Sequence, residues 1–291
     1  MSSSTDPQPP AGQQPLRIVH LACLHCGEPT FDEVLLESVV RRVDDLAADL
    51  VVVAGDLTAS GYEWEYAQAE RWLSQIRARK LVVPGNHDSR NVGYVHFERR
   101  WGARFSRERL AFDEARAAAL GATGLTAVGV DSSEPDLDEG RVGREWYEWI
   151  IEQYDEPADF KVFVLHHHLV AIPGTGRDLN HAVDAGDILP VLTRLGVDAV
   201  LSGHRHVPYF WGLNGVLIAN AGTASSRRTR GLVEPSFNEL VVDADTIRVF
   251  VHYPDGRRDL AATRSRSTRE TIREAFYLTE AFRRSNRILG V

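Results

Sequence analysis

The sequence predicts an α/β fold, a four-layer α/β/β/α sandwich of two mixed sheets flanked by helices. Short apolar runs such as LVVVA at residues 50–54 are typical of buried parallel strands. Between such runs, apolar residues recur at three- and four-residue spacing, as in residues 31–46, which indicates amphipathic helices. Beyond residue 208 the pattern becomes antiparallel, with a hairpin around Asn214 and Gly215. Alternating strands and helices followed by hairpins favour two stacked sheets covered by helices.

The first part of the chain is predicted to form a βαβ crossover. Its strands lie at residues 18–22 and 50–54, a second helix follows Gly61, and the next strand covers residues 81–83. The apolar faces of the two helices are predicted to be Phe31, Val34, Leu35, Val39, Val43 and Leu46, and Trp64, Ala67, Trp72, Leu73 and Ile76.

The middle of the chain begins with an irregular stretch, residues 89–121, in which Tyr94, Phe97 and Trp101 indicate one short helix. Strands follow at residues 125–130, 161–165 and 199–201, and helices at residues 141–153 and 188–195. The helical face of residues 141–153 consists of Trp146, Trp149 and Ile150, and a tryptophan stripe at this spacing favours core packing.

Hairpins are predicted from residues 209–212 with 216–219, and from 237–242 with 246–253. A single domain is therefore predicted at residues 16–256, after a disordered leader at residues 1–15. Residues 257–291 are predicted to be a basic C-terminal helical extension. They contain nine Arg and four acidic residues and so have a net charge of +5. Because the whole chain has a net charge of −8, the rest of it carries −13.

The bulk composition is that of a globular protein, with 43% hydrophobic and 25% charged residues among 291. No apolar run approaches the ~20 residues of a membrane span, and no secretory signal is recognisable. Cys23 and Cys26 are the only cysteines, so no disulfide framework is expected and a cytoplasmic location is predicted. The net negative charge disfavours nucleic acid as a partner over the whole surface.

Five predicted strands end in side chains that can bind a metal ion. The runs are IVHLACLH at 18–25, LVVVAGD at 50–56, LVVPGNHD at 81–88, VFVLHHH at 162–168 and AVLSGHRH at 199–206. Ligands bind at the C-terminal ends of the strands in an open α/β sheet. Buried polar groups also need partners, and these side chains can supply them to one another.

The order of these motifs resembles the calcineurin-like metallophosphoesterases, whose pattern is Asp-x-His, GD, GNHD, a His-His pair and GHxH. The resemblance covers residues 16–253, and it departs at Cys23, where the family has Asp. It implies two metal ions. One would be bound by Cys23, His25, Asp56 and His206, and the other by Asp56, Asn86, His166 and His204.

The resemblance also implies the chemistry. Two cations clamp the oxygens of a phosphoryl displacement and lower the pKa of a bound water enough to form hydroxide near neutral pH. His87 would assist the leaving group, with Asp88 orienting it. Because a thiolate at Cys23 is a soft ligand, iron paired with zinc, manganese or a second iron is expected. Two alternatives stay open for Cys23, a neutral buried thiol beside a weakened site and a redox CxxC pair with Cys26.

The substrate is expected to be a small phosphate ester, with phosphodiesters favoured over phosphomonoesters, and a homo-oligomer is compatible with the sequence. The alternatives are a phosphomonoesterase or nuclease of the same fold, or a metal-binding regulatory protein without activity. His168 is predicted to be solvated, and His20 and His252 to be structural. Candidate substrate-binding residues are Asn86, Arg177, Asn180, His181 and Arg227, with Arg228 and Arg230 as neighbours that could hold phosphate.

Overall fold

Two β-sheets pack face to face in the computed structural model, which describes residues 14–173, 175, 180–230 and 233–274. One sheet has the strand order β13-β12-β11-β10-β1-β2-β3, and the other has the order β4-β5-β6-β7-β9-β8. Both are mixed, because β1, β2 and β3 run parallel whereas β10 to β13 pair antiparallel, and β5, β6, β7 and β9 run parallel whereas β4 and β8 do not.

The strands of the first sheet are β1 (Leu16–Leu21), β2 (Leu50–Ala54), β3 (Arg79–Val83), β10 (Phe237–Val242), β11 (Thr246–His252), β12 (Arg258–Ser265) and β13 (Thr271–Arg273). Those of the second are β4 (Ser106–Ala111), β5 (Gly124–Gly129), β6 (Phe160–Val164), β7 (Ala199–Ser202), β8 (Tyr209–Leu213) and β9 (Val216–Asn220). The helices are α1 (Glu33–Asp45), α2 (Glu63–Leu73), α3 (Gly93–Trp101), α4 (Glu114–Leu120), α5 (Tyr147–Gln153) and α6 (Ala185–Arg194), and short 3-10 turns η1 (Arg90–Val92) and η2 (Arg144–Trp146) precede α3 and α5.

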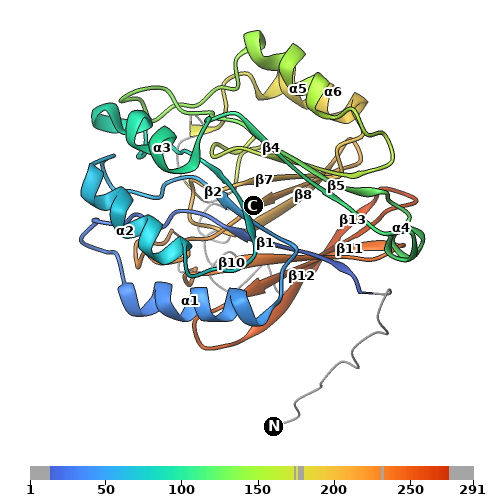
Figure 1. The fold of residues 1–291 in the computed structure, drawn as a ribbon, viewed down its shortest axis with the longest axis horizontal. Helices are drawn as coiled ribbons and strands as arrows, with labels where there is room; N and C mark the ends of the chain where they lie inside the picture. Colours follow the sequence, from blue (N-terminus) through green and yellow to red (C-terminus); the bar gives the residue numbers. More distant parts are fainter. Residues whose placement is uncertain (1–13, 174, 176–179, 231–232, 275–291) are drawn as a thin grey trace, which may run out of the picture.

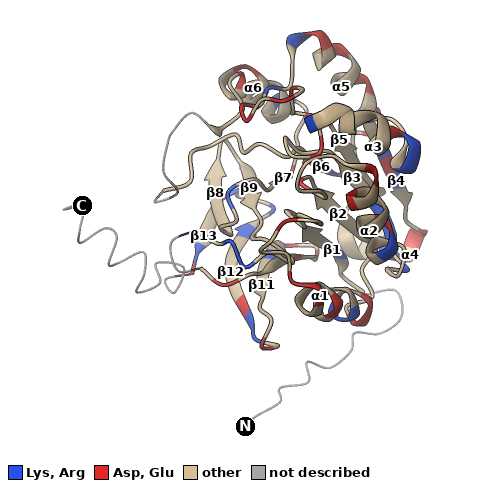
Figure 2. Ribbon diagram, turned by 90° about the vertical axis from the view of Figure 1, so that its left-hand side faces the viewer, with Lys and Arg blue, Asp and Glu red and all other residues tan. Residues whose placement is uncertain are grey.

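The predicted four layers are confirmed. One apolar core lies between the two sheets, a second lies between the first sheet and α1, α2 and α3, and a third lies between the second sheet and α5 and α6. Figure 1 shows α1 and α2 on one side of the strands and α5 and α6 on the other. Charged residues are concentrated on the helices, whereas the central strands are mostly uncharged (Figure 2). Burial of apolar surface on both faces of each sheet accounts for the strands being near-continuous apolar runs.

The helical phase differs from the prediction at three positions. Val34, Trp64 and Trp146 are 76%, 58% and 36% exposed, although all three were predicted to face the core. In α1 the N-cap Asp32 accepts a hydrogen bond from the Leu35 backbone and sets the phase so that Leu36 is buried instead. The 3-10 turn η2 changes the phase before α5, and Trp146 stacks on Phe105 at 3.9 Å between ring centroids.

Residues 89–121 contain more structure than the predicted single helix. The helix α3 is present, but β4 and α4 follow it and were not predicted. The strand β4 is an edge strand paired only with β5 among the described residues, and its polar sequence SRERLA is half-buried. A polar edge strand carries no apolar run, which is why its sequence does not signal a strand.

The predicted helical extension is wrong for residues 258–265 and 271–273, which form β12 and β13. The strand β12 pairs with β11 and buries Ala261 and Ala262, so it extends the first sheet beyond the predicted boundary at residue 256. Residues 275–291, and residues 1–13 of the predicted leader, lie outside the described residues.

Candidate metal centre

Five loops meet where parallel strands of both sheets end. The loops follow β1, β2 and β3 in one sheet and β6 and β7 in the other, and each of them contributes a predicted ligand. The loop after β1 is tied to the loop after β2, because the backbone N–H groups of Cys23 and His25 donate to the carbonyls of Gly55 and Asp56 at 2.9 Å. The backbone of Gly203 likewise donates to the carbonyl of His166 at 3.0 Å. The predicted convergence of the five motifs is therefore present.

Backbone strain is concentrated at these loops. Cys23, His25, Asp56, His204 and His206 have φ angles of 57°, 51°, 55°, 74° and 57°, in the left-handed region that residues with a Cβ avoid. Such conformations cost about 1–3 kcal/mol each and persist where the surrounding structure holds them in place. Strain at five donor residues is typical of a site whose side-chain directions are selected for function.

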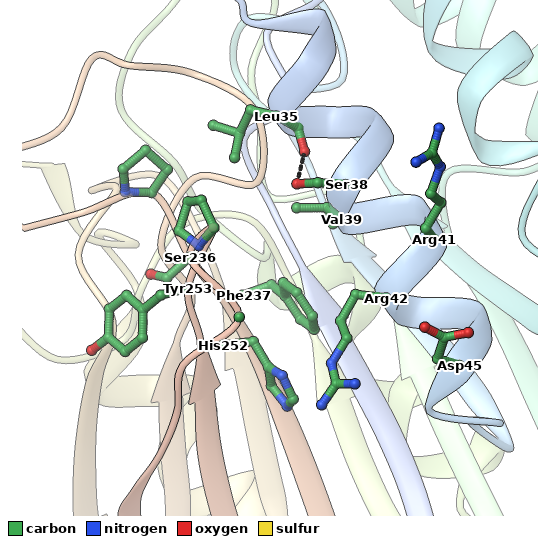
Figure 3. A pocket seen from close by; sticks show the side chains of 13 residues that line it. Leu35, Ser38, Val39, Arg41, Arg42, Asp45, Ser236, Phe237, His252 and Tyr253 are labelled. Atoms are coloured by element: carbon green, nitrogen blue, oxygen red, sulfur yellow. Dashed lines mark hydrogen bonds between the residues drawn. The ribbon is translucent and has the colours of Figure 1, made fainter. Parts of the chain in front are cut away.

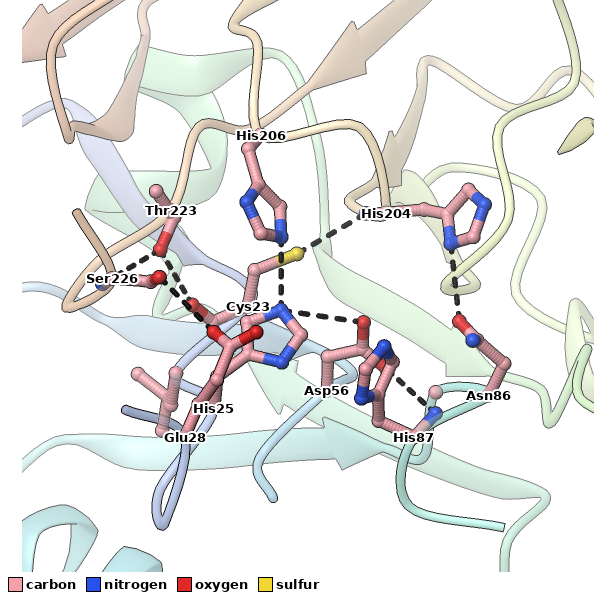
Figure 4. A network of polar contacts seen from close by, with 12 residues as sticks. Cys23, His25, Glu28, Asp56, Asn86, His87, His204, His206, Thr223 and Ser226 are labelled. Carbon is pink, nitrogen blue, oxygen red and sulfur yellow. Dashed lines mark hydrogen bonds and ion pairs between the residues drawn. The ribbon is translucent and has the colours of Figure 1, made fainter. Parts of the chain in front are cut away.

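One group of donors is formed by Cys23, His25, Asp56 and His206 (Figure 4). The Nε2 atoms of His25 and His206 are 2.9 Å apart, and His25 Nε2 is 3.6 Å from Asp56 Oδ2. Cys23 Sγ lies within 4.8 Å of donor atoms of His25 and His206, and also of Asp56 and His166. The thiol is fully buried and accepts a hydrogen bond from the His204 backbone at 3.2 Å.

The second group is formed by Asp56, Asn86, His166 and His204. His166 Nε2 is 3.2 Å from Asp56 Oδ2 and 3.2 Å from His204 Nδ1, which is itself 3.1 Å from Asn86 Oδ1. All four side chains are buried. Asp56 Oδ2 therefore lies near donors of both groups, and Cys23 Sγ also lies within 4.8 Å of donor atoms from both.

Backbone carbonyls fix the orientation of three imidazoles. The Nδ1–H groups of His166, His206 and His87 donate to the carbonyls of Ala54, Arg228 and Ala59. The other nitrogen of each ring, Nε2, takes no part in that hydrogen bond, and for His166 and His206 it faces the cluster. Metal-binding histidines characteristically donate their other nitrogen to a carbonyl or carboxylate in this way.

The protonation states of two histidine donors suit metal binding, whereas for a third, His166, burial lowers the pKa but the Asp56 carboxylate raises it above the ordinary value. Burial lowers the pKa of His25 to about 3 and that of His206 to about 4, so both rings are neutral donors at pH 7. Burial opposes ionisation of Asp56, but the neighbouring His166 and His87 hold its pKa well below the ordinary value. Burial and the Asp56 carboxylate raise the pKa of the Cys23 thiol, so a thiolate here requires a cation beside it.

The donor set fits transition-metal ions. Imidazole nitrogens, one thiol, one amide oxygen and one shared carboxylate converge in a buried site, and several groups of three lie within 4.8 Å of one another. Imidazole and thiolate favour iron and zinc over magnesium or calcium. These residues can therefore hold the metal ions that the sequence predicts.

The ring of His87 is 4.7 Å from that of His25, measured between centroids, and its donor atom lies within 4.8 Å of donor atoms of His25 and Asp56. The prediction that Asp88 orients His87 is wrong, because the carbonyl of Ala59 does so at 2.7 Å from His87 Nδ1. The buried carboxylate of Asp88 instead accepts the backbone N–H groups of Leu57, Thr58 and Gly85 at 2.9–3.0 Å. It thereby joins the loop after Asp56 to the turn before Asn86.

A cavity of about 200 Å³ opens over the cluster. It is lined by His25, Asp56, Asn86, His87, Arg90, Asp138, Asn180, His204, His206, Arg228 and Arg230. A larger cavity, of about 280 Å³, lies between α1 and the adjoining ends of β10 and β11 (Figure 3). Because its polar lining includes no comparable set of metal donors, the smaller cavity is the candidate site.

The predicted substrate-binding residues are only partly at this cavity. Asn86 and Asn180 line it, whereas His181 is not among the lining residues and Arg177 lies outside the described residues. Arg227 is directed elsewhere, because its exposed side chain pairs with Asp32 at the start of α1. Its neighbours Arg228 and Arg230 line the cavity instead.

Two lining residues were missed. Arg90 Nη2 donates to Asp138 Oδ1 at 2.8 Å, and Asn86 Nδ2 donates to the same oxygen at 3.1 Å. Asp138 thus fixes the amide of Asn86 so that its oxygen faces His204. Arg90 lies three residues after His87, which was a usable signal, whereas Asp138 is 48 residues further along the chain and nothing local indicates it.

Three histidines outside the metal donors, His20, His168 and His252, are buried. His168 is 4% exposed and therefore buried, contrary to the prediction that it is solvated. His252 pairs with Glu239 at 2.9 Å and stacks on Phe237, and His20 is buried beside Asn238, as expected of structural histidines.

Among the described residues, no helix combines the length and the apolar character needed to cross a membrane.

The comparisons with known proteins agree with this geometry. The family model of the calcineurin-like phosphoesterases matches residues 16–208. A probable cyclic nucleotide phosphodiesterase of Synechococcus is 25% identical over 60% of this chain, and the match spans 64% of that protein's length. The 3',5'-cyclic adenosine monophosphate phosphodiesterase of Escherichia coli is 24% identical over 84% of this chain and 92% of its own.

Two solved structures share the fold. A purple acid phosphatase of yellow lupin matches 86% of this chain and 53% of its own, with a TM-score of 0.60 and 16% identity. GAP50, described as the anchor in the inner membrane complex of Plasmodium, matches 87% of this chain and 88% of its own, with a TM-score of 0.66 and 13% identity. The family model covers well over half of the chain, and its motifs form one cluster of metal donors, so this protein belongs to the calcineurin-like phosphoesterase family.

Proposed function

We propose that this protein is a phosphodiesterase that binds two transition-metal ions and uses His87 to assist the leaving group. The observation that carries the proposal is the position of Asp56, which lies between a group containing Cys23, His25 and His206 and a group containing Asn86, His166 and His204. Two bound ions would supply Lewis-acid activation of the phosphoryl group and of a water molecule.

His87 is suited to proton transfer. Its Nδ1–H is committed to the Ala59 carbonyl, and its backbone N–H donates to Asp56 Oδ1 at 3.0 Å, so the ring is held while its Nε2 remains available. A positioned imidazole can share a proton with the leaving oxygen, which typically contributes ~10²- to 10⁴-fold in rate.

The charges around the cavity favour a monoanionic phosphodiester. Of the three arginines that line it, Arg90 pairs with Asp138 and Arg228 pairs with Glu28 at 2.8 Å. Among the described residues, Arg230 has no carboxylate within ion-pair distance, so the walls contribute about one uncompensated positive charge. A monoester dianion would gain from more. The names of the relatives from Synechococcus and Escherichia coli point to the same class.

The test pairs an aryl phosphodiester with the matching aryl monoester at neutral pH, on protein whose metal content has been measured. We expect a higher kcat/KM for the diester. A monoester preference of tenfold or more would overturn the diester assignment, and turnover of neither ester by metal-loaded protein would overturn the proposed enzyme.

A second measurement addresses the metals. Anaerobic metal analysis of freshly purified protein is expected to find about two ions per chain, with iron or zinc dominant, because imidazole and thiolate donors prefer them. Protein that binds only magnesium, or only one ion at saturation, would contradict the proposed centre.

A further inference from the structure

Trp64 is the most exposed tryptophan of the chain, with 58% of its surface accessible. Tyr62, two residues earlier in the chain, is also exposed, at 48%. Large aromatic side chains are normally buried to a great extent because of their apolar area, so an indole that is more than half exposed is accessible to a ligand. Neither the metal centre nor the core uses Trp64.

The indole of Trp64 lies close to the candidate metal centre. A Cβ built on Gly27 would be 2.6 Å from Trp64 Cη2, so the indole rests against the Gly27 backbone. Gly27 follows His25 by two residues, which places their Cα atoms within about 7.6 Å. The next residue, Glu28, pairs with Arg228, which lines the cavity, and Figure 4 shows Glu28 beside His25. Trp64 is not itself among the residues that line the cavity, but its indole rests on the segment between His25, which lines the cavity, and Glu28, which pairs with the lining residue Arg228.

The start of α2 holds Trp64 in place. The buried carboxylate of Glu65 accepts the backbone N–H groups of Ser60 and Tyr62 at 2.9 and 3.1 Å, which fixes the first turn of the helix. Gly27 has a φ of +90° and no Cβ, so the indole can approach its backbone closely. The backbone that carries Trp64 is thus fixed and the indole contacts Gly27, while 58% of the surface of Trp64 is accessible to solvent.

We propose that Trp64 is a specificity-determining residue on which a flat heteroaromatic substituent of the substrate stacks, such as the nucleobase of a nucleoside phosphodiester. The inference rests on the proposed function and adds the class of the non-reacting substituent. An exposed indole face is suited to a flat ring because stacking is tolerant of base identity. The guanidinium of Arg228 lines the cavity and pairs with Glu28, the residue after Gly27, so it can contact the phosphate of a substrate whose base reaches Trp64.

The test compares two esters with the same leaving group, the p-nitrophenyl ester of thymidine 5'-monophosphate and methyl p-nitrophenyl phosphate. Trp64→Ala should lower kcat/KM for the nucleoside ester by about 5- to 150-fold, the range expected for loss of one stacking contact, and by less than about twofold for the methyl ester. Trp64→Phe should retain most of the activity. Trp146→Ala, which removes an exposed tryptophan of the other helical layer, should leave both values unchanged.

A binding measurement makes the inference independent of turnover. By calorimetry on metal-loaded protein, Trp64→Ala should weaken binding of thymidine 5'-monophosphate by a similar factor and leave binding of inorganic phosphate unchanged. Equal losses on both esters and both ligands would show that Trp64 only supports the fold, and no loss on either would also overturn the inference. If the wild type hydrolyses neither ester, the proposed function fails, whereas the binding result still decides the role of Trp64.

Discussion

Gly85 forms the wall of the metal centre, and replacing it by alanine should disable the site without any change to a donor residue. A Cβ at this position would be 2.3 Å from Asp56 Oδ1, 2.5 Å from the Asp56 backbone nitrogen and 2.9 Å from His166 Cγ. Its φ angle is not in the left-handed region, so the effect of alanine is steric. The neighbours that would have to move are the shared carboxylate and a second donor.

The size of the effect follows from these distances. Ordinary contacts of a Cβ lie at about 3.4 Å or more, so Asp56 must shift by roughly 1 Å. Inserting a methyl group into a packed region costs about 1–3 kcal/mol, and a displacement of ~1 Å at a reacting centre costs ~10²-fold in rate. We therefore expect Gly85→Ala to lose about 10²-fold or more in turnover and part of its metal.

The assay measures metal content, kcat and urea unfolding for Gly85→Ala beside Gly186→Ala. Gly186 lies in α6, and a Cβ built there meets no atom within 4 Å. That control should keep full activity and gain about 0.4–1 kcal/mol of stability. Wild-type turnover and metal content in Gly85→Ala would refute the reasoning, because they would mean that Asp56 does not need its observed position.

Three further predictions concern single residues. If Cys23 binds iron as a thiolate, Cys23→Ser should lose the thiolate-to-iron charge-transfer absorption of the iron-loaded protein. Cys26→Ser should keep it, because the Cys26 thiol is buried in the core beneath α1 and α2. An unchanged spectrum, metal content and turnover in Cys23→Ser would rule out ligation by Cys23. His87→Ala should lose ~10²- to 10⁴-fold in turnover on esters with poor leaving groups and less on good ones, with metal content intact, and loss of both metals would instead make His87 a ligand. Burial opposes ionisation of Glu239, but His252, Arg258 and Arg17 hold its pKa at about 2, so its contribution to stability is present above about pH 4.5 and is lost as the pH falls towards 2. Glu239→Gln should therefore flatten the fall in unfolding free energy over that range by about 3 kcal/mol, and an unchanged slope in denaturant titrations would contradict the pairing.

The sequence predicted the layers and the donors because both depend on local signals. Apolar runs specify strands, and each donor is covalently attached to the end of such a run, so Asp56 and Asn86 had to emerge at the C-terminal ends of neighbouring parallel strands. Neighbouring ends lie at one sheet edge, which brings the donors together whatever the loops between them do. The same reasoning places His166 and His204, whose strands β6 and β7 are also parallel neighbours.

Only the tertiary structure decided which residues surround these donors. Asp138 binds Arg90 and the Asn86 amide across some 50 residues of chain, and Arg228 rather than Arg227 faces the cavity because Arg227 is held by Asp32. The path of a polar loop depends on side-chain pairs between distant segments, and no local periodicity encodes such pairs. The same is true of Trp64, whose helical spacing alone placed it in the core. Its exposure follows from where α2 begins and from the contact of its indole with Gly27, and both are properties of the folded chain.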